Sequence, residues 1–144
     1  MENFVVLAVV VILTSLFGIW HRSNQGAIKS AKIHPNFSFD YSQFGQMGKK
    51  ATLVQFSTQF CSICPASKEI LTQISNSHTG VEFIEIDAEE NLNLTKKLSI
   101  LSTPTVLILD ELGEEVARFS GRPNKIKIVN FINEDLPSSN VEKV

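Results

Sequence analysis

The chain has 144 residues, 13 Lys and Arg against 15 Asp and Glu, and a formal net charge of −2. This length suits one domain, or one domain with a short additional segment. Hydrophobic residues at 43% and charged residues at 19% exclude a disordered or collagen-like chain. The slight acidic excess argues against a nucleic-acid partner. Two cysteines are too few for a disulfide-stapled mini-protein.

The apolar residues concentrate in an uncharged N-terminal segment. Fourteen of the 17 residues from Phe4 to Trp20 are hydrophobic. As a helix this segment would span roughly 25 Å, slightly short of the ~30 Å hydrocarbon core of a bilayer. Trp20 is a residue type that suits the membrane interface. We therefore expect residues 1–22 to form a membrane anchor, a transmembrane helix that enters the membrane through residues 4–20.

Two other interpretations of this segment stay open, a cleaved signal peptide and a buried helix of a soluble domain. No Lys or Arg precedes the segment and no small-x-small cleavage site follows it, which disfavours a signal peptide. A soluble helix would need a polar face. Arg22, Lys29 and Lys32 follow the segment, with no acid before Asp40. This bias favours a single-pass cell-membrane protein with its globular part in the cytoplasm, the extracytoplasmic side being the alternative.

The rest of the chain divides into a linker, one globular domain and a tail. Residues 23–35 are polar and basic without clear periodicity, which predicts a linker. Residues 36–137 are expected to form the globular domain, and residues 138–144 a frayed tail. From Asn36 to Leu136 there are 9 bases and 13 acids, so this part carries a net charge of −4.

The hydrophobic pattern of the globular part predicts alternating strands and helices. Phe37, Phe39 and Tyr41 alternate with polar residues, which predicts a short first strand. Further strands are expected at residues 51–56, 81–86, 105–109 and 116–119. Apolar side chains at helical spacing predict three helices, carried by Ile63, Ala66, Ile70, Leu71 and Ile74, then Leu92, Leu94 and Leu98, then Ile126, Val129, Phe131 and Ile132. This order predicts an α/β fold with a mixed central sheet and helices on both faces.

The sequence Cys61-Ser62-Ile63-Cys64 lies between a predicted buried strand and a predicted amphipathic helix, and its two cysteines are the candidate reactive groups. Residues i and i+3 of a first helical turn lie roughly 5–6 Å apart, which suits a disulfide that opens and closes. Cys61 is expected at the helix N-terminus, where backbone N–H groups and the helix dipole favour a thiolate, the attacking species. Cys64, one turn deeper, would resolve the mixed disulfide.

Three other interpretations of this cysteine pair compete with a redox site. A zinc site needs two further ligands, and the three histidines of the chain, His21, His34 and His78, have no ligand spacing. A static disulfide closing so short a loop adds little stability. Two buried free cysteines are the third interpretation. We favour the redox site, and expect no metal and no organic cofactor because the dithiol is itself the redox group.

From Phe37 to Ile132 the sequence resembles the thioredoxin family. The resemblance rests on the strand-Phe-Cys-x-x-Cys-helix run from Val54 to Ile74, the strand VEFIEID, the Thr103-Pro104-Thr105 step and Gly121. It implies a thioredoxin-like fold with a cis Thr103–Pro104 bond beside the dithiol. It also implies that the backbone at Thr103 offers hydrogen bonds to a substrate segment.

Several residues around the dithiol depart from the family pattern. Phe60 replaces the usual Trp before the first Cys, and Ser62-Ile63 replaces Gly-Pro between the two. Pro65 stands where a basic residue is common, a position in the first helical turn where Pro is tolerated.

A further departure concerns proton transfer. Gln55 and Phe83 occupy the positions of a buried acid and its lysine neighbour, which help proton transfer at the second Cys in thioredoxins. Losing both together avoids an unpaired buried charge. Glu85 or a water is a candidate replacement, although Glu82, Glu85 and Asp87 are more typical of a solvated strand face.

These observations predict a membrane-anchored thiol-disulfide oxidoreductase, a disulfide reductase for protein cysteines. Cys61 attacks and Cys64 resolves, while an unidentified redox partner regenerates the dithiol. Substrate contacts are expected from Phe60, Ile63, Thr103 and Pro104. The alternatives are a non-catalytic thioredoxin-fold binding or scaffold domain, and a dedicated electron-relay subunit of a membrane redox complex.

Overall fold

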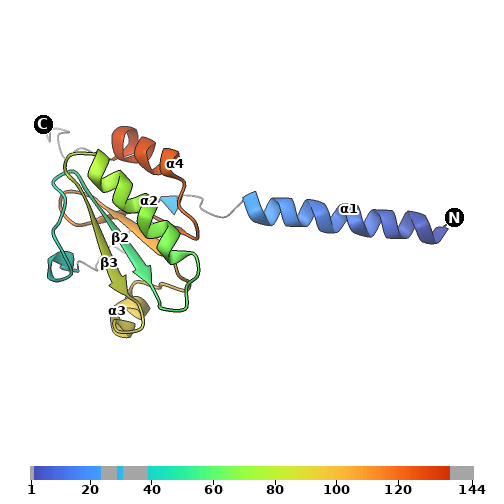
Figure 1. The fold of residues 1–144 in the computed structure, drawn as a ribbon, viewed down its shortest axis with the longest axis horizontal. Coiled ribbons are helices and arrows are strands. Elements are labelled where there is room, and N and C mark those ends of the chain that lie inside the picture. The colour runs from blue at the N-terminus through green and yellow to red at the C-terminus, as the bar shows by residue number, and fades with distance from the viewer. Residues whose placement is uncertain (1, 24–28, 31–38, 137–144) are drawn as a thin grey trace, which may run out of the picture.

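The computed structural model describes residues 2–23, 29–30 and 39–136 (Figure 1). Its helices and strands are α1 (Glu2–Ser23), β1 (Lys29–Ser30), β2 (Ala51–Ser57), α2 (Cys64–Ser77), β3 (Val81–Asp87), α3 (Leu92–Lys97), β4 (Thr105–Leu109), β5 (Glu115–Ser120) and α4 (Lys125–Asn130). A 3-10 helix at Tyr41–Gln43 precedes β2, and a π-helical turn at Phe131–Asp135 extends α4. The strands and helices predicted from residue 51 onward are confirmed.

The strands form one mixed sheet in the order β1-β5-β4-β2-β3. β2 pairs parallel with β3 and antiparallel with β4, and β5 pairs antiparallel with both β4 and β1. β2 therefore has a neighbour on each side. Residues 51–56 are all buried, as expected for a central strand covered on both faces.

Side chains of β2 alternate between two apolar clusters on opposite faces of the sheet. Leu53 packs in one cluster with Leu71 of α2 and Ile128 of α4. Val54 packs in the other with Leu94 of α3. In Figure 1, α2 and α4 lie side by side over one face of the sheet. The predicted thioredoxin-like α/β arrangement, a mixed sheet with helices on both faces, is confirmed.

The predicted first strand is wrong in its described part. Phe37 lies outside the described residues, and the chain forms the 3-10 helix from Tyr41 instead. The Asp40 carboxylate accepts a hydrogen bond from the Ser42 N–H at 2.9 Å and caps this helix. The bonds from Ser42 also lower the pKa of Asp40. Because Phe39 and Tyr41 both pack on the cluster under α3, their spacing reflects a turn and not two faces of a strand.

Strand β1 lies inside the segment predicted as a linker. Lys29 is opposite Arg118 and Ser30 is opposite Ala117, so β1 adds an edge to β5. Two residues give no periodicity, which explains why the sequence pattern missed them. The rest of that linker and the predicted tail lie outside the described residues.

The N-terminal apolar segment forms helix α1. Residues 4–19 are all exposed, and the Thr14 hydroxyl donates to the Val10 carbonyl within the helix at 2.9 Å. Within residues 2–23, 29–30 and 39–136, no helix combines the length and apolar character that a membrane crossing needs. The expected transmembrane helix is therefore not confirmed. The side chains of Arg22 and Lys29, and all of Lys32, lie outside the described part, so the orientation inferred from them stays a prediction.

Candidate functional site

The dithiol lies in the turn that leads from β2 into α2. The Cys61 N–H donates to the Thr58 carbonyl and the Cys64 N–H donates to the Cys61 carbonyl, both at 3.2 Å. α2 begins at Cys64, and the Ser67 N–H donates to the Ile63 carbonyl at 3.0 Å. Cys61 therefore lies just ahead of the helix and not in its first turn. Pro65 has no N–H to lose and falls in that first turn, as expected.

This later start of α2 changes which residues face the core. The predicted stripe included Ile63 and Ala66, but both are exposed. The face that packs on the sheet carries Cys64, Ser67, Leu71 and Ile74, spaced by three, four and three residues. Leu92 and Ile126, also assigned to apolar faces, are exposed as well. Cys64 thus lies at the N-terminal end of the buried face of α2.

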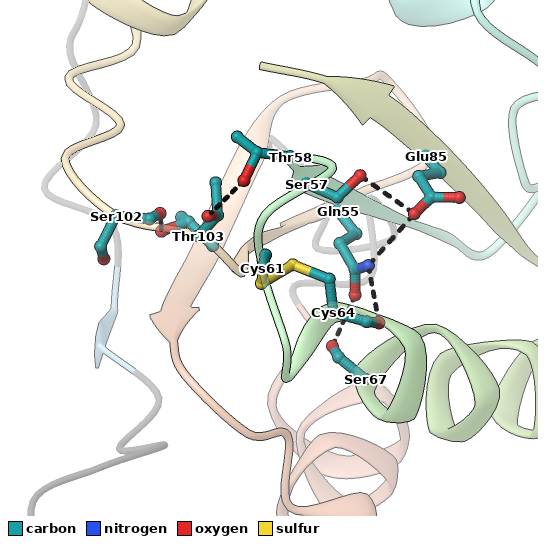
Figure 2. The surroundings of a disulfide bond; sticks show 10 residues. Gln55, Ser57, Thr58, Cys61, Cys64, Ser67, Glu85, Ser102 and Thr103 are labelled. Carbon is teal, nitrogen blue, oxygen red and sulfur yellow. Dashed lines mark hydrogen bonds between the residues drawn. A yellow bond between two sulfur atoms is a disulfide. The ribbon is translucent and has the colours of Figure 1, made fainter. Parts of the chain in front are cut away.

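Cys61 and Cys64 form a disulfide, with their Cα atoms 5.4 Å apart (Figure 2). This distance is within the range expected for the i and i+3 positions. Cys64 is only 4% exposed, whereas Cys61 is partly exposed. When the bond is open, an incoming disulfide can reach the sulfur of Cys61 more readily than that of Cys64.

The Thr103–Pro104 peptide bond is cis, as the resemblance implied. The Thr103 and Thr58 hydroxyls lie 3.3 Å apart, and Thr58 also accepts from Cys61, so this loop is linked directly to the dithiol turn (Figure 2). Gly121, at a φ of +85° that favours glycine, donates its N–H to the Pro104 carbonyl at 2.9 Å. The end of β5 therefore holds the loop beside Cys61.

Two exposed apolar side chains flank the cysteines. Phe60 is 82% exposed and Ile63 is 43% exposed. Each is adjacent in sequence to a cysteine of the pair. Their role in substrate binding stays a prediction.

Gln55 of β2 lies beneath the dithiol with its side chain fully buried. Its Oε1 accepts from the Ser67 hydroxyl at 2.5 Å, and its Nε2 donates to the Cys64 carbonyl at 3.3 Å. Nε2 also lies 3.5 Å from the Glu85 carboxylate (Figure 2). The position that holds an acid in the family therefore holds a neutral amide whose two ends are both bonded.

The sequence suggested that Glu85 belongs to a solvated strand face, but the structure places it in a hydrogen-bonded network. Its carboxylate accepts from the Ser57 hydroxyl at 3.0 Å and forms an ion pair with Lys68 at 2.6 Å. Phe83 lies on the same strand, partly buried against the cluster beneath α2. The structure thus supplies an acid–lysine pair near the dithiol, but at different positions from those of the family pattern.

Three residues of this site, Thr58, Ser67 and Lys68, were not predicted from the sequence. Ser67 carried a usable signal, because it falls three residues after Cys64 and four before Leu71, on the buried face of the helix. A polar residue on such a stripe needs a hydrogen-bond partner. Thr58 and Lys68 carried no comparable signal.

This geometry defines a thiol-disulfide oxidoreductase: a disulfide at the start of a helix, with one partly exposed and one buried cysteine, linked to a cis-proline loop. Reduced, the pair holds two electrons that can pass to another disulfide.

The comparisons with known proteins agree with that class. A sequence profile of the thioredoxin family matches residues 34–134. The thioredoxin of Ovis aries is 30% identical over 103 residues, which cover 72% of this chain and 95% of its own length. Solved thioredoxins of Nicotiana alata and Fasciola hepatica are 27% and 28% identical, with TM-scores of 0.53 and 0.52. Each covers 60% of this chain, and the matches span 73% and 81% of their own chains. The chain belongs to the thioredoxin family.

Proposed function

We propose that this protein is a membrane-anchored disulfide reductase for protein cysteines, acting through the Cys61–Cys64 pair. The observation that carries this proposal is the unequal exposure of the two cysteines of one disulfide. Cys61 is partly exposed just ahead of α2, and Cys64, the first residue of α2, is buried. Two sulfurs placed in this way can take different roles in one exchange reaction.

The reaction runs in two balanced steps. The Cys61 thiolate attacks one sulfur of a substrate disulfide, a mixed disulfide forms, and the other substrate sulfur leaves as a thiolate. The Cys64 thiolate then attacks the sulfur of Cys61, which forms the Cys61–Cys64 disulfide and releases the second substrate thiolate. Two electrons pass from the dithiol to the substrate, and a separate redox partner must restore the dithiol.

The surface around Cys61 supports binding of an extended substrate segment. The Thr103 backbone lies in the loop linked to the dithiol turn through Thr58. Exposed Phe60 and Ile63 would contact apolar side chains next to the substrate cysteine. We propose that Thr103 and Pro104 dock the substrate backbone, while the two apolar side chains add contact area.

Reduction of insulin by the fragment 24–144, which keeps β1 and lacks α1, tests the activity with dithiothreitol as electron donor. Wild-type fragment is expected to accelerate reduction and Cys61→Ser to abolish the acceleration. Ser62→Ala, a change at an exposed residue between the cysteines, is the matched control and is expected to leave the rate unchanged. Wild-type fragment that reduces no protein disulfide would favour the scaffold or dedicated-relay alternatives.

We propose that α1 attaches the protein to the membrane. Twelve large hydrophobic side chains of this helix are exposed, a surface that is typical of contact with lipid or another protein. In cell fractionation the full chain is expected in the membrane fraction and to resist alkaline extraction. The fragment without residues 1–23, which lacks only α1, is expected in the soluble fraction. Full chain released by alkali would contradict insertion.

We further propose that the globular part faces the cytoplasm. The support is the charge bias in the sequence, with Arg22, Lys29 and Lys32 after the apolar segment and no Lys or Arg before it. In that compartment thiols are kept reduced, which suits a reductase. After reduction with dithiothreitol and its removal by washing, a membrane-impermeant maleimide is expected to label Cys61 only after lysis. Labelling in intact cells would place the domain on the outer side.

A further inference from the structure

Gln55 is the polar side chain that joins the sheet to the dithiol. It is fully buried, and the Cys64 carbonyl that its Nε2 contacts belongs to the first residue of α2. Its Oε1 accepts from Ser67 one turn further along the same helix. One amide therefore ties both the start and the second turn of α2 to β2 (Figure 2).

The two ends of this amide are not interchangeable. The Cys64 carbonyl and the Glu85 carboxylate only accept hydrogen bonds, so both require the NH2 end. A flipped amide would place its oxygen against these two oxygens. The Ser67 hydroxyl can donate or accept and would fit either end. The acceptors on the Nε2 side therefore set the orientation of Gln55.

Glu85 is itself held in place from several directions. The parallel register puts it directly beside Gln55 on the neighbouring strand. Lys68 of α2 binds one carboxylate oxygen, and Ser57 donates to the other, the same oxygen that faces Gln55. The Glu85 side chain is 30% exposed and that of Lys68 is 55% exposed, so the ion pair closes the edge of the network toward solvent.

We propose that Glu85 is a positioning residue for the resolving cysteine. This inference rests on the proposed reductase function. The carboxylate fixes the Gln55 amide, and the amide fixes the backbone that carries Cys64. When Cys64 attacks, a Cys61–Cys64 bond forms, the bond from Cys61 to the substrate breaks, and the substrate sulfur leaves with the electron pair. A glutamine amide does not accept the Cys64 proton, so this proton passes to the substrate thiolate that the first step released. Gln55 supplies geometry in this step and no proton transfer.

A single-turnover reaction of the reduced full-length chain in detergent with 5,5′-dithiobis(2-nitrobenzoate) separates the two steps. Attack by Cys61 releases the first coloured thiolate, and resolution by Cys64 releases the second. Glu85→Met is expected to slow the second release about five- to tenfold, the factor of one hydrogen bond, and to leave the first unchanged. Glu85→Gln, which keeps an acceptor oxygen, is expected to stay within about twofold of wild type.

Two further variants make the result decisive. Glu82→Met, on the same strand but outside the network, is the matched control and is expected to change neither phase. Lys68→Met, at a largely exposed side chain, is expected to slow the second release about two- to threefold, so the test survives if Glu85→Met fails to fold. A second release unchanged in both Glu85→Met and Lys68→Met would overturn the proposal.

The conservative variant and the wild type separate the remaining explanations. Glu85→Gln as slow as Glu85→Met would also overturn the proposal, because charge and not orientation would then control the step. Wild type that completes both releases but reduces no protein disulfide would refute the proposed function alone. The positioning role would then still be decided by the variants.

Discussion

Ser67→Ala offers the clearest thermodynamic test of the buried network beneath the dithiol. Ser67 and Gln55 are both fully buried, and the serine hydroxyl donates to the Gln55 oxygen at 2.5 Å. Alanine would leave that oxygen without a donor in a site closed to water. An unsatisfied buried polar group costs about 1–3 kcal/mol in the free energy of unfolding. With an ordinary urea dependence, the unfolding midpoint should fall by roughly 1 M.

Urea unfolding of the fragment 24–144, followed by circular dichroism, measures this effect. Ser77→Ala on the same helix is the matched control, because Ser77 is exposed and, among the described residues, its hydroxyl donates only to the Gln73 carbonyl. Alanine gains helix propensity at both positions, so that contribution largely cancels. The control should change stability by less than about 0.5 kcal/mol.

A double variant shows whether the effect belongs to the pair. Gln55→Leu with Ser67→Ala removes both partners, so the combined loss should be smaller than the sum of the two single losses by about 0.5–3 kcal/mol. Equal stability of Ser67→Ala and Ser77→Ala, or strict additivity in the double variant, would contradict a stabilising role for the Ser67–Gln55 hydrogen bond.

Three further predictions concern other parts of the fold. Burial raises the pKa of Tyr41, the single tyrosine of the chain, above its ordinary value of 10.0, with a contribution from the Glu115 carboxylate. The unfolded chain then loses the phenolic proton first, so the free energy of unfolding should fall as pH rises above 10, and Tyr41→Phe should lack that part of the loss in pH-dependent urea titrations. Arg118→Met leaves the Leu98 carbonyl and the Glu115 carboxylate without their donor, and should destabilise the fragment by about 1–3 kcal/mol in urea, whereas exposed Arg122→Met should not. Phe60→Ser should raise KM for reduction of insulin and leave the rate with a small aliphatic disulfide unchanged; an equal effect on both substrates would contradict a binding role.

Much of the fold followed from hydrophobic patterning. The central strand at residues 51–57 and the strand at residues 105–109 are buried on both faces, so their continuous apolar runs identified them. The hydrophobic pattern gave the wrong element where aromatic residues of a turn pack on the core. Phe39 and Tyr41 have strand-like spacing, but the capping bond from Ser42 to Asp40 favours a 3-10 helix. Local side-chain bonds of this kind do not appear in a hydrophobic period.

Part of the candidate site could also be predicted from the sequence, and part could not. The Cys61–Cys64 pair and the cis bond before Pro104 followed from sequence, because spacing and a family step carry them. The bonds of Gln55 with Ser67 and Glu85 did not, since they depend on the parallel register of β2 and β3 and on the rotation of α2. The apolar stripe was assigned through Ile63 and Ala66, which are exposed, so the buried position of Ser67 was not recognised. Register and helix start are tertiary properties that a single sequence specifies only weakly.

The most direct test of the roles assigned to Cys61 and Cys64 is trapping of the mixed disulfide by the Cys64→Ser variant. The reduced variant is mixed with an oxidised protein substrate, quenched with acid and analysed by mass spectrometry without reductant. We expect a covalent complex joined through Cys61, released by dithiothreitol and absent when Cys61→Ser is used instead. No complex with Cys64→Ser, or an equal yield of complex through Cys64 in the Cys61→Ser variant, would contradict the assigned roles.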